Sequence, residues 1–319
     1  MRDHGGNIDG AIARFGGTDW IDLSTGINRV PYPVPTLVPE DWTMLPTAAA
    51  KAALLDVAAA AYGTQAPMLA VAGAQAAIQM IPRLRMPGKA RVLGPTYNEH
   101  AAALRAAGWQ VQEVTRLGQL AGADLAVVVN PNNPDGASHA PADLLALAGQ
   151  VGQLVVDESF ADAQPALSLA AMAGQDGLLI LRSFGKFYGL AGVRLGFVIG
   201  SATDIAALQE MSGPWPVNGA ALRIGGVALA DRGWATATVQ RLRAEMQTAD
   251  ALAAAAGWQA LGGCELFRLY DTPDAEQAQA RLARHRIWSR IFPYSNRWLR
   301  LGLPGGDLEW ARLTQALEG

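Results

Sequence analysis

The chain has 319 residues, half of them hydrophobic, and a net charge of −3. This length and apolar content fit a globular protein with a large core, in one big domain or two unequal ones. Because there is no surplus of basic residues, nucleic-acid binding is not expected. No apolar run reaches the roughly 20 residues that a membrane helix needs. No export signature is visible, and the single cysteine, Cys264, fits a reducing compartment, so we expect a cytoplasmic protein.

Three regions follow one another along the chain. The first 45 residues, rich in proline and glycine, predict an arm (1–45). Residues 46–205 alternate short apolar runs with helical patterns, which predicts a large α/β domain with a mainly parallel sheet and helices on both faces. Residues 206–319 predict a smaller α+β domain. The expected strands are 68–72, 90–93, 125–130, 154–157, 178–182, 195–199, 265–270 and 298–303, and the expected helices are 74–84, 99–107, 140–150, 203–211, 234–256, 273–284 and 307–317.

A lysine follows one of these strands directly. Lys186 lies in the glycine-rich segment 183–196, an unusual place for a plain surface charge. Burial lowers the pKa of a lysine, and a partly neutral amine can form a Schiff base with an aldehyde. The Ser183 hydroxyl and the Arg194 guanidinium flank it and are natural partners for a phosphate. The alternative is a glycine-rich turn with incidental charges.

Other strand ends carry further candidates, because ligands of open parallel sheets bind beyond the carboxyl ends of the strands. Asp157 ends an apolar strand and could pair with a pyridinium nitrogen, or instead cap a helix or pair with an arginine. Asn133, in the turn 130–136, could donate to a phenolate oxygen, although such segments are more often plain turns. The backbone amides of 73–75 could bind an anion, and Tyr97 could stack on a ring.

Together and in this order, these motifs resemble the fold-type I pyridoxal-phosphate family, and its aminotransferase branch in particular, over nearly the whole chain. The resemblance implies a seven-stranded type of sheet in the large domain, pyridoxal 5′-phosphate as cofactor, and a homodimer. It implies that Lys186 forms the Schiff base, that Asp157 faces the pyridine nitrogen, and that Asn133 contacts the 3-hydroxyl. It assigns ring stacking to Tyr97, phosphate binding to Ala74, Gln75, Ser183 and Arg194, and a contact with the partner subunit's phosphate to Tyr62.

The N-terminal segments narrow the resemblance. His4-Gly5-Gly6-Asn7 and residues 22–28 resemble the threonine-phosphate decarboxylases of cobalamin synthesis and, closely, the histidinol-phosphate aminotransferases. The start of the chain and residues 215–218 favour decarboxylation of L-threonine O-3-phosphate to (R)-1-amino-2-propanol phosphate. Transamination of histidinol phosphate or another amino acid is the alternative. The implied site for this small phosphorylated substrate comprises His4, Gly5, Gly6, Asn28, Arg290 and Arg300, although His4 could instead be a disordered terminal residue.

One position departs from the family pattern. Phe160 stands three residues after Asp157, where many relatives carry a tyrosine that also touches the 3-hydroxyl.

Other classes of protein find little support in the sequence. The histidines lie too far apart for a typical zinc site, and neither a Walker loop nor a dinucleotide fingerprint is present. A non-catalytic regulator usually adds a DNA-binding module, for which this chain has no room.

Overall fold

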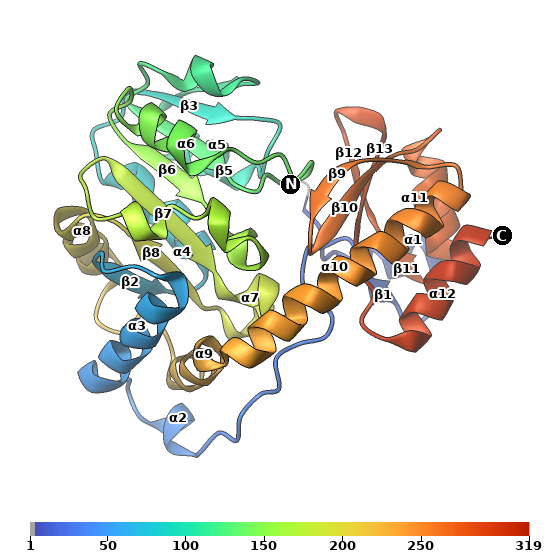
Figure 1. Cartoon of the computed structure of the whole chain (residues 1–319), viewed down its shortest axis with the longest axis horizontal. Coiled ribbons are helices and arrows are strands. Elements are labelled where there is room, and N and C mark those ends of the chain that lie inside the picture. The colour runs from blue at the N-terminus through green and yellow to red at the C-terminus, as the bar shows by residue number, and fades with distance from the viewer. Residues whose placement is uncertain (1–3, 319) are drawn as a thin grey trace. The chain divides into compact units, whose positions relative to one another are not determined.

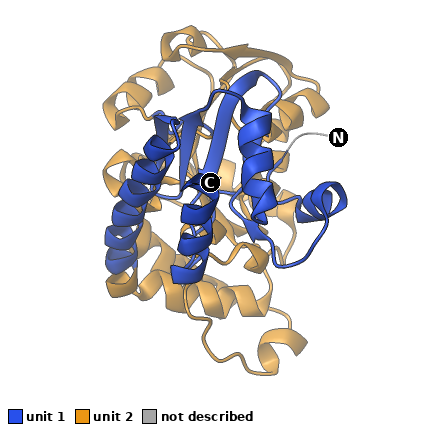
Figure 2. Cartoon of the chain, turned by 90° about the vertical axis from the view of Figure 1, so that its right-hand side faces the viewer, with its two compact units in different colours: residues 1–31, 134–137, 235–319 blue, residues 32–133, 138–234 orange. Residues whose placement is uncertain are grey.

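The computed structural model describes residues 4–318 and divides into two compact units, coloured separately in Figure 2. Unit 1 is formed by the chain up to residue 31, by residues 134–137 and by the chain from residue 235 onward. Unit 2 is formed by residues 32–133 and 138–234. The expected boundaries between arm, large domain and small domain stay a prediction.

Unit 2 is built on a seven-stranded sheet with the strand order β2-β8-β7-β6-β5-β3-β4 (Figure 1). β8 runs antiparallel to both of its neighbours, and the other strand pairs are parallel. The expected α/β fold with a mainly parallel sheet is therefore confirmed. The strands are β2 (Met68–Val71), β3 (Lys89–Leu93), β4 (Gln110–Val114), β5 (Leu125–Val129), β6 (Leu154–Asp157), β7 (Leu178–Ser183) and β8 (Gly196–Ile199).

The two faces of this sheet are both buried, which explains why its strands read as nearly continuous apolar runs. In β6, Val155 belongs to the core on one face and Val156 to the core on the other. Side chains alternate along a strand, so Asp157 points to the same face as Val155. The same alternation places Ser183 at the end of β7 on that face. The face that carries Val155, Asp157 and Ser183 is covered by α4 (Ala74–Met80), α5 (Glu99–Ala106) and α8 (Ala202–Ser212). The opposite face is covered by α6 (Pro141–Ala148).

Several helices of unit 2 differ from the sequence expectation, and α2 (Glu40–Thr43), α3 (Ala48–Tyr62), α7 (Phe184–Phe187) and α9 (Gly219–Ala230) were not among the expected ones. The helix expected over 74–84 ends at Met80 and continues as a short 3-10 turn, because Pro82 has no N–H to continue an α-helix. α9 was not expected, since its glycines lower helix propensity. A Cβ at Gly225 would lie 2.5 Å from Leu195, so this glycine lets α9 pack closely. α10 (Arg232–Ala255) also begins in unit 2.

Unit 1 contains an antiparallel four-stranded sheet with the order β12-β13-β10-β9. A parallel pair, β1 with β11, brings the N-terminal residues Ile21 and Leu23 into the core of this unit. The elements are α1 (Ile8–Phe15), β1 (Ile21–Asp22), β9 (Gln259–Cys264), β10 (Phe267–Asp271), α11 (Ala275–Arg284), β11 (Ile287–Trp288), β12 (Arg290–Phe292), β13 (Ser295–Gly302) and α12 (Asp307–Glu318). Among residues 4–318, we find no helix with the length and apolar character to span a bilayer.

Candidate active site

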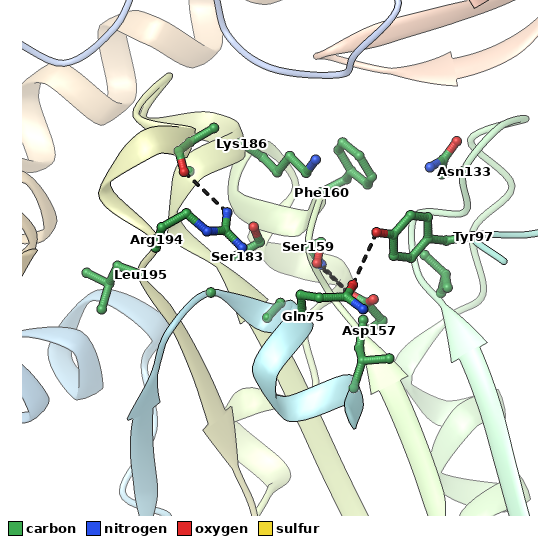
Figure 3. A pocket seen from close by; sticks show the side chains of 16 residues that line it. Gln75, Tyr97, Asn133, Asp157, Ser159, Phe160, Ser183, Lys186, Arg194 and Leu195 are labelled. Carbon is green, nitrogen blue, oxygen red and sulfur yellow. Dashed lines mark hydrogen bonds between the residues drawn. The ribbon is translucent and has the colours of Figure 1, made fainter. Parts of the chain in front are cut away.

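A pocket in unit 2 lies at the carboxyl ends of β5, β6 and β7. Open parallel sheets bind their ligands at this edge. Figure 3 shows its side chains converging from several separate segments of the chain. The pocket brings together the cofactor-binding residues expected from the sequence except one, namely Ala74, Gln75, Tyr97, Asn133, Asp157, Ser183, Lys186 and Arg194.

Lys186 projects from α7, a single helical turn that begins where β7 ends. Its Nζ lies 5.6 Å from the centre of the Phe160 ring, so the position that departs from the family pattern faces the amine. Behind the lysine, the rings of Phe184 and Tyr188 stack at 4.5 Å, and Tyr188 stacks on Trp234 at 5.5 Å. This aromatic stack anchors the short helix from which the lysine projects.

Asp157 is almost completely buried and accepts several hydrogen bonds. Its Oδ2 lies 2.8 Å from His100 Nε2, and its Oδ1 accepts from the Ser159 amide at 2.9 Å and the Ser159 hydroxyl at 2.5 Å. Burial acts to raise the pKa of Asp157, but the hydrogen bond and charge of His100 and the bonds from Ser159 outweigh burial, so the pKa lies below its ordinary value. The carboxylate is thus kept ionised.

His100 was missed as a site residue in the sequence analysis. It lies on the side of α5 that packs into the core, next to Ala101 and Leu104. A histidine on the apolar side of a predicted helix needs a buried polar partner, which is the signal that could have revealed it. Which partner it has cannot be read from the sequence, because Asp157 is 57 residues away.

Ser183 and Arg194 lie near the turn that precedes α4, and two glycines make this arrangement possible. A Cβ at Gly73 would stand 2.7 Å from Arg194 Nη2, and a Cβ at Gly196 would stand 2.5 Å from the Ala74 amide nitrogen. Arg194 itself adopts a left-handed conformation, with φ of 56°. The guanidinium therefore lies against the turn at 73–74, and this turn lies against the start of β8, so a side chain at either glycine would displace its neighbours.

Tyr97 and Asn133 come from two loops that are tied together by Asn132. Thr96 Oγ1 donates to Asn132 Oδ1 at 2.6 Å, and Asn132 Nδ2 donates to the Pro95 carbonyl at 3.0 Å. These bonds hold the aromatic ring and the Asn133 amide at the same end of the pocket. Asn132 was not predicted as a site residue, and its role is visible only once the two loops meet.

Tyr62 is the expected cofactor-binding residue that does not line this pocket. Its ring packs against Phe197 at 5.6 Å and lies under the Arg182 guanidinium at 4.3 Å. The phenolic oxygen is buried, and burial raises the pKa of Tyr62 well above its ordinary value. Its assignment to a partner subunit's phosphate stays a prediction.

Three of the expected substrate-binding residues meet around Ser24 in unit 1. The Gly6 amide donates to Ser24 Oγ at 2.8 Å, and Arg300 Nη2 donates to the Ser24 carbonyl at 2.5 Å. A Cβ at Gly5 would lie 2.3 Å from that same carbonyl oxygen, so the residue must be glycine for the segment to pack there. Ser24 lies in the segment whose resemblance was noted, but its linking role was not predicted.

Arg290 and Arg300 lie directly opposite each other on β12 and β13. Like charges in this position repel, and burial followed by the charge of Arg290 lowers the pKa of Arg300 to about 9. Two guanidinium groups so placed favour binding of an anion, which would relieve their repulsion.

The remaining two substrate candidates are placed differently. Asn28 is buried, and its Oδ1 accepts from Arg241 Nη2 at 2.8 Å and from the Val30 amide at 3.1 Å. The side-chain oxygen of Asn28 therefore holds the backbone at Val30 and the Arg241 side chain in place. His4 is exposed on the surface of unit 1.

The groups that line the pocket of unit 2 match the parts of pyridoxal phosphate one by one. Lys186 can bind the aldehyde, and the ionised Asp157 suits a protonated ring nitrogen. A tyrosine ring, an amide, and a hydroxyl with a guanidinium beside a glycine turn suit the aromatic ring, the phenolic oxygen and the phosphate. The residues present therefore fit the cofactor.

A mainly parallel sheet that gathers a lysine, an aspartate and an arginine at one pocket is the arrangement of a fold-type I pyridoxal-phosphate enzyme. Residues 43–317 match the family model for aminotransferase class I and II, and the chain belongs to this family.

Two relatives resemble the chain over nearly its whole length. It is 43% identical to the threonine-phosphate decarboxylase of Pseudomonas aeruginosa, an alignment that covers 100% of this chain and 98% of the relative. It is 42% identical to the threonine-phosphate decarboxylase of a Sinorhizobium species, covering 98% and 97%. The structure of histidinol-phosphate aminotransferase from Sinorhizobium meliloti with pyridoxal-5′-phosphate superposes with a TM-score of 0.84 at 20% identity, covering 97% of this chain and 93% of that one, which shows a shared fold.

Proposed function

We propose that this chain is a pyridoxal-phosphate-dependent carboxy-lyase that converts L-threonine O-3-phosphate to (R)-1-amino-2-propanol phosphate and carbon dioxide, a step of cobalamin biosynthesis. The observation that carries the proposal is the identity of more than two-fifths, over the full length, with two threonine-phosphate decarboxylases. The likeness to an aminotransferase at 20% identity concerns the fold.

Residues of unit 2 hold the cofactor in this proposal. Lys186 would bind it covalently, Asp157 would pair with the ring nitrogen, Asn133 would contact the 3-hydroxyl and Tyr97 would stack on the ring, while Ala74, Gln75, Ser183 and Arg194 would bind the phosphate. When bound, the cofactor supplies an electron sink for the electron pair left on the substrate's α-carbon as the bond to the carboxylate breaks.

Two side chains control protons in this reaction. The Asp157 carboxylate, whose pKa is held low, would stabilise a proton on the cofactor's ring nitrogen. Lys186 Nζ, which lies 5.6 Å from the centre of the Phe160 ring in the same pocket, would donate a proton to the substrate's α-carbon after carbon dioxide has left. The α-carbon of the product then carries this proton where the substrate carried its carboxylate.

Residues of unit 1 recognise the two anionic groups of the substrate. We assign the substrate carboxylate to Arg300, and its phosphate ester to Arg290, His4 and the amides of Gly5 and Gly6, with Asn28 fixing the local chain. Arg300 must orient the carboxylate without stabilising it more than the transition state, because otherwise loss of carbon dioxide is slowed.

A substrate screen tests the proposal. The purified holoenzyme is incubated with L-threonine O-3-phosphate, and carbon dioxide and the amine product are measured. We expect equal amounts of both, without added 2-oxoglutarate. A requirement for 2-oxoglutarate, with keto-acid release or turnover of histidinol phosphate, would instead identify an aminotransferase.

We also propose a homodimer in the cytoplasm. Large apolar side chains are exposed near a groove lined by α2, α3 and α9, including Met44 at 60%, Leu45 at 63% and Val227 at 44%. The groove also carries an ion pair, from Arg223 Nε to Asp41 Oδ2 at 2.6 Å, and a two-fold interface would place this same surface on both subunits. A second copy of the chain is therefore the partner we propose for this surface.

The cytoplasmic location that we propose rests on the single cysteine, which fits a reducing compartment.

A further inference from the structure

A chain of hydrogen bonds leads from Tyr97 into the first turn of α5. The Tyr97 hydroxyl donates to Gln75 Oε1 at 3.2 Å, and Gln75 Nε2 donates to Glu99 Oε2 at 3.0 Å. Figure 3 shows the Gln75 amide facing the Tyr97 hydroxyl within the pocket. Glu99 is only 5% exposed and is not among the residues that line the pocket.

The Glu99 carboxylate determines which end of the Gln75 amide faces the tyrosine. An ionised carboxylate only accepts hydrogen bonds, so the NH₂ group of the amide must turn toward it. The amide carbonyl must then turn toward Tyr97, which can donate. The reverse orientation would bring two acceptor oxygens together in a poorly solvated place, where such a contact is most unfavourable.

We propose that Glu99 is a positioning residue, which sets the orientation of the Tyr97 ring through Gln75. The inference rests on the proposed function, in which that ring stacks on the cofactor. Without the carboxylate, the amide has no preferred direction and the hydroxyl loses its defined acceptor. The ring is then held less firmly, and its contact with the cofactor weakens. Because the effect passes through the Tyr97 hydroxyl, it must disappear when this hydroxyl is absent.

A double-mutant cycle tests this route. The dissociation constant of pyridoxal phosphate is measured by fluorescence titration of cofactor-free wild type, Glu99→Gln, Tyr97→Phe and the double variant. Visible circular dichroism of the bound cofactor reports its surroundings. We expect Glu99→Gln and Tyr97→Phe each to weaken binding about 3- to 10-fold and to change the dichroism. The double variant should bind no more weakly than Tyr97→Phe alone.

Asp204→Asn is the matched control. It alters another buried contact between a glutamine and a carboxylate, from Gln153 Nε2 to Asp204 Oδ2 at 3.2 Å, away from the residues that line the pocket. It should lower the melting temperature and leave cofactor affinity and dichroism unchanged. Should Glu99→Gln not fold, Gln75→Leu must show the same loss and the same dependence on the Tyr97 hydroxyl.

Two results would overturn the inference while the proposed function stands. Glu99→Gln could behave like the Asp204→Asn control, with unchanged cofactor affinity and dichroism. Alternatively, the loss of affinity in the double variant could equal the product of the losses in the two single variants. Failure of the wild type to bind the cofactor would instead refute the proposed function, and this inference with it.

Discussion

Lys186 is one of three lysines in the chain, and the other two, Lys51 and Lys89, do not line the pocket. Borohydride reduction of the holoenzyme should therefore attach the cofactor to the peptide that contains Lys186, as read by mass spectrometry. Lys186→Ala should lower turnover by several orders of magnitude, because both the covalent link and the proton donor are lost. Lys89→Ala, an exposed change, should remain active. Label on another lysine, or an active Lys186→Ala variant, would contradict the assignment.

Gly73 offers a second test at the scale of one residue. A methyl group there would lie 2.7 Å from Arg194 Nη2, in a backbone conformation with φ of 75°. We expect Gly73→Ala to displace the guanidinium and to weaken cofactor binding about tenfold, as measured by titration. Gly63 has a similar φ of 64°, but a Cβ there would meet nothing within 4 Å. Gly63→Ala thus carries the backbone strain without the clash, and an equal loss in both variants would exclude the role of Arg194.

Between elements, the contact of α5 with β6 sets the charge of Asp157. The folded-state pKa of this aspartate is depressed, so its hydrogen bonds stabilise the protein above the ordinary pKa of about 4 and this stability is lost as pH falls through the folded value. His100→Gln removes the histidine charge, so the pKa of Asp157 should rise. The acid-side fall in melting temperature should then begin at a higher pH than in wild type.

The control for this change is His285→Gln, which alters a histidine of unit 1 outside the pocket. Its profile of melting temperature against pH should follow that of the wild type between pH 3 and 7. If His100→Gln also followed it, the histidine would not be what keeps the aspartate ionised.

The elements differ in how visible they are in the sequence, and burial explains the difference. β6 was predicted with the bounds Leu154–Asp157 that the structure has, because a strand buried on both faces is an uninterrupted apolar run. β4 was missed, since Gln110–Val114 is a mostly exposed edge strand with a polar sequence. In unit 1, β9 was missed because its glycines give no strand pattern, and pairing with β10 is what makes it a strand.

For the whole molecule, the exposed apolar surface beside α2, α3 and α9 predicts self-association. Sedimentation velocity should show a dimer, and Leu45→Glu should weaken it at least tenfold by placing a charge in the interface. Leu308→Glu is the matched control, since Leu308 is 86% exposed on α12 in unit 1. A wild-type monomer, or equal dissociation in both variants, would refute this interface.

Local patterns in the sequence, with the family that they resemble, were enough to predict the class of fold and the cofactor, and they indicated Lys186 as the residue that would bind it. Alternation of apolar runs and the residues that follow each strand are local properties, and parallel strands bring their carboxyl ends to one edge. The tertiary structure decided the partners of these residues: His100 for Asp157, Asn132 between two loops, Glu99 behind Gln75, and a buried place for Tyr62. Such contacts join residues that are tens of positions apart, and their energy depends on burial and direction, neither of which a linear pattern contains.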